Sequence, residues 1–312
     1  MKEKLKTFLA ICVLVLTMPY IITLLFQQND TSPDSKHTPL SAKDTALQQP
    51  VSTDDPNMDI EEYLEGVVAN EIPLDFHLEA IKAQAVIART TLTSALESGT
   101  DDLPASMSRE EMLTLWGQDG FETNYRVLET AIESTRGEVI TYDGSRILAA
   151  YHAVSAGATR SAFDALGNEN APYLSTVESD LDIPSPDYLN VTFLDKKDFL
   201  HKLQDACPAL KTTEDKVLDA VSIDGRDESG YVTQVTLGET TMSGENFREC
   251  LNLNSACFSL KEVEGRIRIV TKGLGHGLGL SQYGANEMAK EGMDYREILN
   301  YYYQGIAIQK DG

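Results

Sequence analysis

The chain has few basic residues for its length. Its 312 residues include 26 Lys and Arg against 49 Asp and Glu, which gives a formal net charge of -23 at pH 7. Because proteins bind the phosphate backbone of nucleic acids through a basic face, this balance argues against nucleic acid as a partner. No run of lysine or arginine changes that conclusion, and the acidity also disfavours strongly anionic ligands.

Motifs for nucleotides and metals are missing as well. The glycine-rich segment Gly273 to Ala285 has Leu278 where a dinucleotide fingerprint needs its third glycine, and the chain has no P-loop. Of the four cysteines, Cys12 lies in an apolar run, while Cys250 and Cys257 are separated by six residues and have no neighbouring histidine. We therefore expect no cofactor and no metal, and at least one unpaired thiol among the other three cysteines.

One long hydrophobic run is present, at the N-terminus. Phe8 to Phe26 is a stretch of 19 residues without a charge, and it follows Lys2, Lys4 and Lys6. Such a run is long enough to cross a bilayer core of roughly 30 Å, and the lysines favour a cytoplasmic N-terminus. Because no small-residue cleavage site follows the run, we interpret residues 1–26 as an uncleaved single-pass membrane anchor.

The remaining chain divides into a linker and one domain. Residues 27–57 are rich in Gln, Asp, Ser, Thr and Pro and have almost no aliphatic periodicity, which is typical of a disordered linker. Residues 58–312 are expected to form the catalytic domain. The chain is 42% hydrophobic, so a domain of this length can bury a core.

Helical and strand patterns interleave along this domain. The patterns predict helices over residues 59–71, 75–97, 124–136, 244–251, 282–290 and 295–303, and a short helix opened by Ser108 and Glu111. Hairpins are expected over 138–154, with a turn at Asp143-Gly144, and over 217–237, with short strands near Phe258 and at 267–270. No succession of buried parallel strands and helices is visible, so we expect an α+β fold of helices and antiparallel hairpins.

Glu71 lies between two strong helical patterns. Ahead of it, apolar residues follow helical spacing from Ile60 to Val68, and Pro73 disfavours helical conformation at the residue before it. The first helix should therefore end at Asn70 or Glu71. The negative end of the helix dipole and the apolar surroundings both favour the protonated carboxyl. A glutamate that donates a proton near neutral pH is suited to general acid catalysis, and a solvated glutamate at a helix end is the alternative.

The segment GLGHGLGLSQYGA is the second chemical feature. Its glycines predict a loop whose backbone amides can face a ligand before a helix begins. Ser281, Gln282 and Tyr283 combine hydroxyl, amide and aromatic groups, which suit a sugar. His276 could be a base, a ligand or a structural turn residue. A nucleophilic pair of Ser281 and His276 is possible, but no G-x-S-x-G elbow holds the serine.

These features together resemble one family, on the segments VVANEIP, KAQAVIART, TRGEVITYDG, GLGHGLGLSQYGA and ILNYYY. They occur in the order found in the stage II sporulation protein D family, and the likeness to that family runs over nearly all of residues 59–308. The resemblance implies a lytic transglycosylase of peptidoglycan glycan strands at the sporulation septum, active during engulfment. It also implies stage II sporulation proteins P and M as partners and a preference for strands without stem peptides.

The resemblance places catalysis on Glu71 and puts Arg89 near the site. The expected substrate-binding residues are Arg89, His152, Ser155, Tyr173, His276, Ser281, Gln282 and Tyr283. Ser155 opens SAGAT, residues 155–159, a small-residue turn where a backbone can approach a ligand. Some family members hold zinc after the first hairpin, but here His152 has no Cys or second His nearby in sequence, so no zinc site is expected.

A single carboxylate is enough for the implied reaction. Ordinary glycosidases use two, because one of them activates water or forms a covalent intermediate. A lytic transglycosylase uses the sugar's own 6-hydroxyl instead and leaves a 1,6-anhydro ring. The alternative is a non-catalytic glycan-binding activator or scaffold of a cell-wall amidase. A metal-dependent hydrolase is disfavoured by the lack of ligand clusters.

Overall fold

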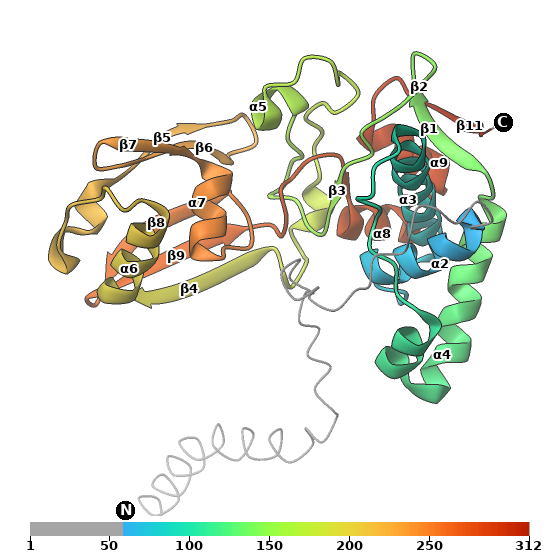
Figure 1. Ribbon diagram of the computed structural model, residues 1–312, viewed down its shortest axis with the longest axis horizontal. Helices are drawn as coiled ribbons and strands as arrows, with labels where there is room; N and C mark the ends of the chain where they lie inside the picture. Colours follow the sequence, from blue (N-terminus) through green and yellow to red (C-terminus); the bar gives the residue numbers. More distant parts are fainter. Residues whose placement is uncertain (1–58, 312) are drawn as a thin grey trace, which may run out of the picture. The chain divides into compact units, whose positions relative to one another are not determined.

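The computed structural model describes residues 59–311, whose helices and antiparallel sheets confirm the expected α+β fold class (Figure 1). The expected anchor, residues 1–26, and the expected linker, residues 27–57, lie outside the described residues. Within residues 59–311 no helix combines the length and the apolar character that a membrane span requires.

The first two helices flank Glu71. Helix α2 (Ile60–Glu71) begins after Asp59, whose side chain accepts a hydrogen bond from the Glu61 amide, as the expected N-cap does. It ends where the sequence predicts, because Ile72 before Pro73 is extended, with φ -133° and ψ 140°. The buried face of α2 packs on helix α3 (Leu78–Ser98), and both contribute to one apolar core.

Helix α3 begins three residues later than expected. Its N-cap is His77, whose ring accepts a hydrogen bond from the Glu79 amide. The His77 amide donates in turn to Asn286 Oδ1 at 2.7 Å. The start of α3 is therefore fixed by a residue 209 positions away, which a local pattern cannot show.

Helix α4 (Arg109–Ser134) replaces the two separate helices that the sequence suggests. Ser108 and Glu111 form the expected capping box at its start. Gly117 has non-helical φ 67° and ψ 170°, so α4 is kinked into two segments there. The aromatic rings of Phe121 and Tyr125 stack just after the kink, with centroids 5.3 Å apart.

A small sheet covers part of the helices. Strands β1 (Glu138–Tyr142) and β2 (Ser145–Arg146) form the predicted hairpin, and Asp143 and Gly144 both have positive φ in its turn. Strand β11 (Ala307–Lys310) pairs with the other edge of β1. The prediction that this hairpin runs on to residue 154 is wrong. Strand β3 (Tyr151–His152) leaves the hairpin and pairs in parallel with β10 (Leu280–Ser281).

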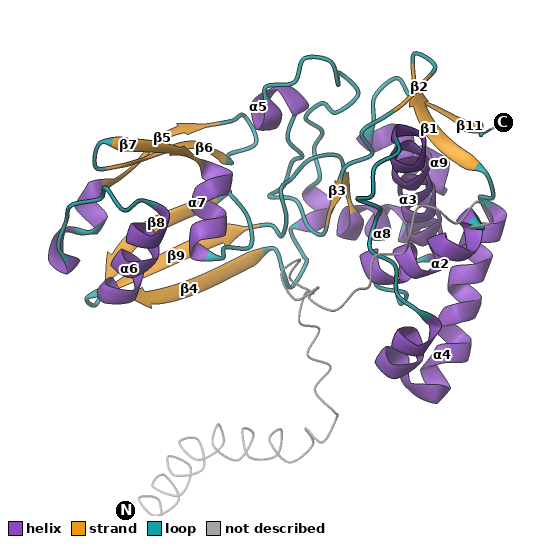
Figure 2. Ribbon diagram, in the orientation of Figure 1, coloured by secondary structure: helices purple, strands orange, loops and turns teal. Residues whose placement is uncertain are grey.

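Residues 189–272, here called the β region, hold two three-stranded antiparallel sheets and two helices (Figure 2). The first sheet has the order β4-β9-β8 and consists of β4 (Leu189–Asp195), β9 (Arg266–Lys272) and β8 (Phe258–Val263). The second has the order β5-β6-β7 and consists of β5 (Val221–Arg226), β6 (Val232–Leu237) and β7 (Thr240–Ser243). Helices α6 (Lys196–Ala206) and α7 (Gly244–Leu251) pack against these sheets around an apolar core.

The other described residues, 59–188 and 273–311, are here called the helical region. Besides α2, α3 and α4 it contains α5 (Ala162–Leu166), α8 (Gln282–Lys290) and α9 (Tyr295–Tyr302). Short 3-10 helices occur at Asp180–Asp182 (η1) and, in the β region, at Glu214–Lys216 (η2) and Leu218–Ala220 (η3). The elements β4, α6, α5, β7 and β11 were not predicted from the sequence.

One arginine joins the two regions. Arg160 of the helical region is 3% exposed and forms ion pairs with Asp227 at 2.6 Å and Glu245 at 2.8 Å, both in the β region. Its guanidinium also lies over the ring of Tyr231, 4.9 Å from the centroid. The Tyr231 hydroxyl accepts a hydrogen bond from the Ala156 amide. A buried charge network therefore holds the regions together.

Candidate active site

Glu71 is the last residue of α2, and residues from two other elements hold it in place. Gln84 of α3, which is fully buried, donates from Nε2 to Glu71 Oε2 at 2.7 Å. Gln282, the first residue of α8, donates from its Nε2 to the main-chain oxygen of Glu71 at 2.8 Å and to Gln84 Oε1 at 3.2 Å. The two amides therefore fix both the backbone and the carboxyl group of Glu71.

Burial raises the pKa of Glu71 from its ordinary value of 4.5 to about 7, against hydrogen bonds from Gln84 and Tyr151 that lower it. The expected direction is therefore found, with burial as its main cause. Gln84 is a neutral donor, and no cation is among the causes of the shift. Because Glu71 is only partly buried by its surroundings, a ligand can reach a carboxyl group that is about half protonated at neutral pH.

Tyr151 reaches Glu71 because β3 lies beside β10. The parallel pairing sets Tyr151 against Leu280 and His152 against Ser281, so that Tyr151 lies near the start of α8. Burial and the neighbouring Glu71 raise the pKa of the Tyr151 hydroxyl, which therefore stays protonated and acts as a donor. Tyr151 was not predicted as a site residue.

The glycine-rich loop packs against residues 150–160. A Cβ on Gly279 (φ 68°) would lie 1.9 Å from the Ala150 oxygen, and one on Gly277 (φ 82°) would lie 2.6 Å from the Tyr231 ring. The amides of Leu274 and Leu280 donate to Val154 and Ala150. We expected this loop to offer its backbone to a ligand, and the structure does not support that expectation. The glycines instead allow the loop to pack closely on neighbouring parts of the chain.

The two histidines are neutral and lie within the fold. Burial lowers the pKa of His152 to about 4, and burial with nearby positive charge lowers that of His276 to about 3. Their ring centroids are 5.9 Å apart. His276 Nδ1 accepts from the Leu278 amide, and the ring is also hydrogen bonded to the Tyr151 backbone. His276 thus supports the strand that carries Tyr151.

His152 leaves one nitrogen without a partner. Its Nδ1 donates to the Leu278 oxygen at 3.0 Å, and its buried Nε2 has no hydrogen-bond partner. A zinc site does not fit these residues, because no three His, Cys, Asp or Glu side chains within residues 59–311 are grouped to hold a metal. The described cysteines, Cys207, Cys250 and Cys257, are all free thiols.

Ser281 and Ser155 are structural residues and not substrate contacts. Both are fully buried. Ser281 Oγ donates to Asp182 Oδ1 at 2.7 Å and accepts from the Gly284 amide as the N-cap of α8. The Ser155 amide donates to the other oxygen of Asp182, which also accepts from Ser179 Oγ. The sequence analysis missed Asp182, whose buried carboxylate organises the start of α8.

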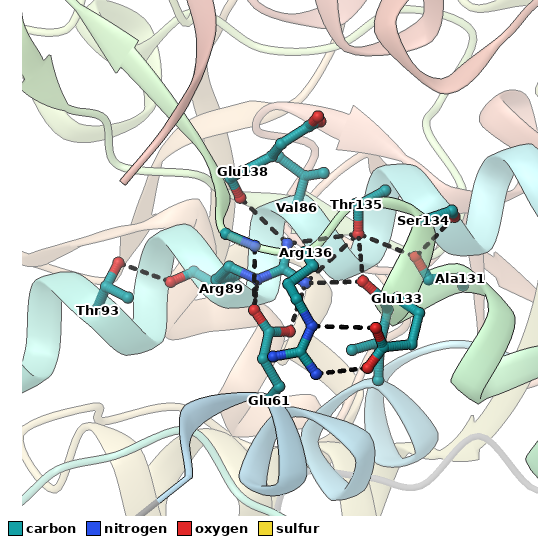
Figure 3. A network of polar contacts seen from close by, with 12 residues as sticks. Glu61, Val86, Arg89, Thr93, Ala131, Glu133, Ser134, Thr135, Arg136 and Glu138 are labelled. Atoms are coloured by element: carbon teal, nitrogen blue, oxygen red, sulfur yellow. Dashed lines mark hydrogen bonds and ion pairs between the residues drawn. The ribbon is translucent and has the colours of Figure 1, made fainter. Parts of the chain in front are cut away.

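Arg89 does not line the site. Its side chain is 1% exposed and forms a two-point ion pair with Glu61, at 3.0 and 2.8 Å. Figure 3 shows the same guanidinium bonded to Thr135 and to the Glu138 backbone. Glu61 and Glu71 lie about 15 Å apart along α2, since a helix rises about 1.5 Å per residue. Arg89 therefore joins α2, α3 and α4 and is not available to a sugar.

The two remaining tyrosine candidates differ in exposure. Tyr173 is 8% exposed, and its hydroxyl accepts from the Leu148 amide, so it stabilises the loop after β2. Tyr283 is partly exposed and follows directly after Gln282. Of the residues expected to bind substrate, Gln282 contacts Glu71. Tyr283 follows Gln282 in the chain, and the His276 ring is bonded to the Tyr151 backbone; both side chains are partly exposed.

Gln84 and Tyr151 are the residues of the site that the sequence analysis missed. A signal for Gln84 was present, since a glutamine in the otherwise apolar stretch KAQAVIA must find a partner when it is buried. No local signal points to Tyr151, because its place beside Glu71 depends on pairing with residues about 130 positions away.

Comparison with known proteins supports the resemblance seen in the sequence. Residues 54–142 match the SpoIID family, described as Stage II sporulation protein. The chain is 34% identical to Stage II sporulation protein D of Bacillus subtilis (strain 168), over 99% of this chain and 96% of that protein. The protein of the same name from Bacillus amyloliquefaciens is 32% identical, over 96% and 94%. The Amidase enhancer of Bacillus subtilis (strain 168) is 27% identical, over 78% of this chain and 40% of that protein.

Proposed function

Because the chain belongs to the stage II sporulation protein D family, whose members act in sporulation, we propose that it is a lytic transglycosylase of peptidoglycan glycan strands. The observation that carries the proposal is the environment of Glu71. This carboxyl group is accessible, has a pKa near 7 and is oriented by neutral donors. A general acid and base that must both give and take a proton needs a pKa close to the working pH.

In the first step, Glu71 donates its proton to the glycosidic oxygen while the bond from that oxygen to the anomeric carbon breaks. The leaving sugar departs with a hydroxyl group, and the anomeric carbon becomes an oxocarbenium-like centre. The Glu71 carboxylate then takes the proton of the 6-hydroxyl as its oxygen bonds to the anomeric carbon. Glu71 ends protonated, the product carries a 1,6-anhydro ring, and no water is consumed.

The hydrogen bonds around Glu71 suit this double role. Gln84 and Tyr151 donate to the carboxyl group and stabilise the carboxylate that exists between the two proton transfers. Burial opposes them and keeps a protonated fraction available for the first transfer. The balance of these effects lets one residue act first as acid and then as base.

A second catalytic carboxylate is not supported by the geometry. Asp182, the buried acid that organises the start of α8, accepts hydrogen bonds from the Ser155 amide, Ser179 and Ser281 and is fully buried. With no exposed oxygen, it cannot activate a water for hydrolysis. This favours the single-carboxylate route over the two-carboxylate route of glycosidases.

Mass analysis of products from peptide-free glycan strands tests the proposal. The wild-type chain should release anhydro fragments, each lighter by one water than the corresponding hydrolysed fragment. Glu71→Gln should reduce cleavage by at least about a thousandfold, because the amide has no transferable proton. The control Glu62→Gln, on the same helix but exposed, should cleave normally. Hydrolysed products, or an active Glu71→Gln variant, would contradict the mechanism.

Location and partners belong to the same proposal. Residues 8–26 would anchor the chain in the cell membrane, with the catalytic domain on the outer face at the sporulation septum. Stage II sporulation proteins P and M would be its partners, and the preferred strands would be those without stem peptides. The acidic composition is compatible with a neutral glycan and argues against nucleic acid.

The second candidate is an amidase-activating role, favoured by the similarity to the Amidase enhancer over 78% of this chain. This candidate needs no proton transfer by Glu71. If it holds, the Glu71→Gln variant should stimulate a purified cell-wall amidase as well as the wild-type chain does, and neither should release anhydro sugars alone.

A further inference from the structure

Strand β4 is an edge strand with an exposed apolar face. Within residues 59–311 it pairs on one side, with β9, and has no partner strand on the other. Leu189, Val191 and Phe193 are 55%, 46% and 42% exposed. Because side chains alternate along a strand, these three lie on the same face.

The neighbouring strand adds positive charge to this face. In the β4–β9 register, Leu189 lies opposite Lys272, Val191 opposite Val270 and Phe193 opposite Arg268. Directly opposite residues of antiparallel strands lie on the same side of the sheet. On the next strand, Lys261 lies opposite Arg268 and extends the same row. We call this surface, made of the β4, β9 and β8 side chains just named, the β4 face.

The charge of the β4 face is opposite to that of the chain. Lys261, Arg268 and Lys272 lie on it, and Arg266 lies at its end with the guanidinium 5.5 Å from the Phe193 ring centroid. Asp195 lies at the same end and is already paired with Arg266 at 2.9 Å. A chain with net charge -23 thus carries a locally basic apolar surface, which is complementary to an acidic partner.

Arg268 also lacks a hydrogen-bond acceptor. Its Nε is buried and has no partner within the described chain, although Arg268 lies at the centre of the β4 face. Buried donors almost always have acceptors, so an unpaired one needs an explanation. A carboxylate presented to this face would bring a charge that matches the Arg268 guanidinium.

Little in the strand itself protects the edge, because its one charged residue, Asp195, lies at its end and is paired with Arg266. From Leu189 to Leu194 there is no charge and no proline, and the pairing with β9 has no bulge. Natural edge strands usually carry such features, because an unprotected edge offers free backbone groups to another strand. The absence of these features in β4 is typical of an edge used for binding.

We propose that the β4 face binds an extended acidic segment of a partner protein, which pairs with β4 as an additional strand. The backbone of the segment bonds to the free edge. Its apolar side chains cover Val191 and Phe193, and its carboxylates meet Arg268 and Lys272. The proposal is independent of catalysis by Glu71, because none of these residues is in the candidate active site.

Charge decides between this occupant and a second copy of the chain. A twofold pairing of β4 with β4 would place the two apolar rows side by side and leave the basic rows of both β9 strands, about 14 Å apart, without a partner charge. A segment with acidic residues between apolar ones supplies that partner charge and uses all of the observed surface chemistry.

Two labelled peptides about ten residues long, mixed separately with the purified full-length chain, test the proposal by fluorescence anisotropy. At every second residue, on the side that meets the β4 face, one peptide alternates Val with Glu and the other alternates Val with Lys, and both carry Thr at the positions between. The acidic peptide should bind at least about tenfold more tightly, and more weakly as salt rises. Methylating the backbone nitrogens along one edge of the acidic peptide should abolish binding, because it removes the ladder donors.

The matched variants are Val191→Glu and Leu115→Glu, which both introduce a charge at an exposed apolar residue. Val191→Glu should weaken binding of the acidic peptide at least about tenfold, and Leu115→Glu, on α4, should not change it. Both variants should cleave glycan normally. Equal affinity for the two peptides, no binding of either, or equal effects of the two variants would overturn the proposal. So would a concentration-dependent dimer that Val191→Glu disrupts and the acidic peptide does not.

Discussion

The two regions of the molecule differ in what they bury and in what they expose. The β region has an apolar core, and its buried polar side chains are Ser255, Thr271 and Asp227, the partner of Arg160. The helical region buries more charged and amide groups, among them Arg89, Gln84 and Asp182. The large apolar side chains that the β region exposes form one row on β4, whereas those of the helical region are spread over α4, α5 and loops.

Because of this difference, the two regions are suited to two kinds of function. Burial of a polar group lowers the stability of the fold unless the group has a hydrogen-bond or charge partner. In the helical region the buried polar groups have such partners, and their contacts position Glu71 or the elements around it. Such an arrangement is suited to chemistry, which needs fixed donors and shifted pKa values. An exposed apolar face is suited to binding another macromolecule. The difference is consistent with the proposed catalysis in the helical region and the proposed docking in the β region.

The largest effect is expected from breaking the link between the regions. Arg160→Met should lower the free energy of unfolding by about 3–5 kcal/mol, because it leaves the buried Asp227 without its charge partner. The control Arg136→Met removes an exposed ion pair with Glu133 and should leave the free energy of unfolding nearly unchanged. Urea unfolding of both variants measures the difference. Equal losses would mean that the Arg160 network does not couple the regions.

A gain of stability is expected from removing the catalytic carboxyl group. The pKa of Glu71 is about 7 when folded and 4.5 ordinarily, so between these values the folded state holds a proton that the unfolded state has released. The stabilising contribution of Glu71 is therefore lost as pH rises through 7. At about pH 8, Glu71→Gln should be more stable than the wild type by about 2–3 kcal/mol, and at about pH 4 the two should be equal.

Thermal unfolding at the two pH values checks this prediction. Glu62→Gln, at an exposed position of the same helix, should show no such pH-dependent gain. If Glu71→Gln gave the same stability difference at both pH values, the burial assigned to the Glu71 carboxylate would be wrong.

A smaller effect is expected at Tyr151. Its hydrogen bond lowers the pKa of Glu71, so Tyr151→Phe should raise that pKa and move the alkaline limb of the kcat/KM profile upward. The shift should be about one pH unit or less, since a hydrogen bond to a charged group contributes roughly 1.5 kcal/mol. Tyr283→Phe should leave the limb in place. A downward shift in Tyr151→Phe would show that Tyr151 does not stabilise the carboxylate.

Local signals predicted much of the helical region. Asp59 and Pro73 delimit α2, and Ser108 with Glu111 begins α4, because capping and proline effects depend on a few adjacent residues. The raised pKa of Glu71 followed from its place between apolar helix faces. The start of α3 and the contact of Tyr151 with Glu71 could not be predicted, because each depends on residues more than 100 positions away.

Strand β4 was missed for a different reason. On its half-buried side only Leu194 is apolar, beside Thr192 and the exposed Asn190, while Leu189, Val191 and Phe193 lie on the exposed side, so the apolar residues do not mark the core side of the strand. Arg89 was misplaced because the family pattern gives a residue's position in sequence but not its partners. Its partner Glu61 lies one helix earlier, and the pair is buried.

The central claim is that Glu71 is a buried acid poised near neutrality, and direct titration of its carboxyl carbon tests that claim. In protein labelled with ¹³C-glutamate, the Glu71 resonance is the one absent from Glu71→Gln. We predict a titration midpoint of about 7. A midpoint near 4.5, the ordinary value for glutamate, would contradict the account.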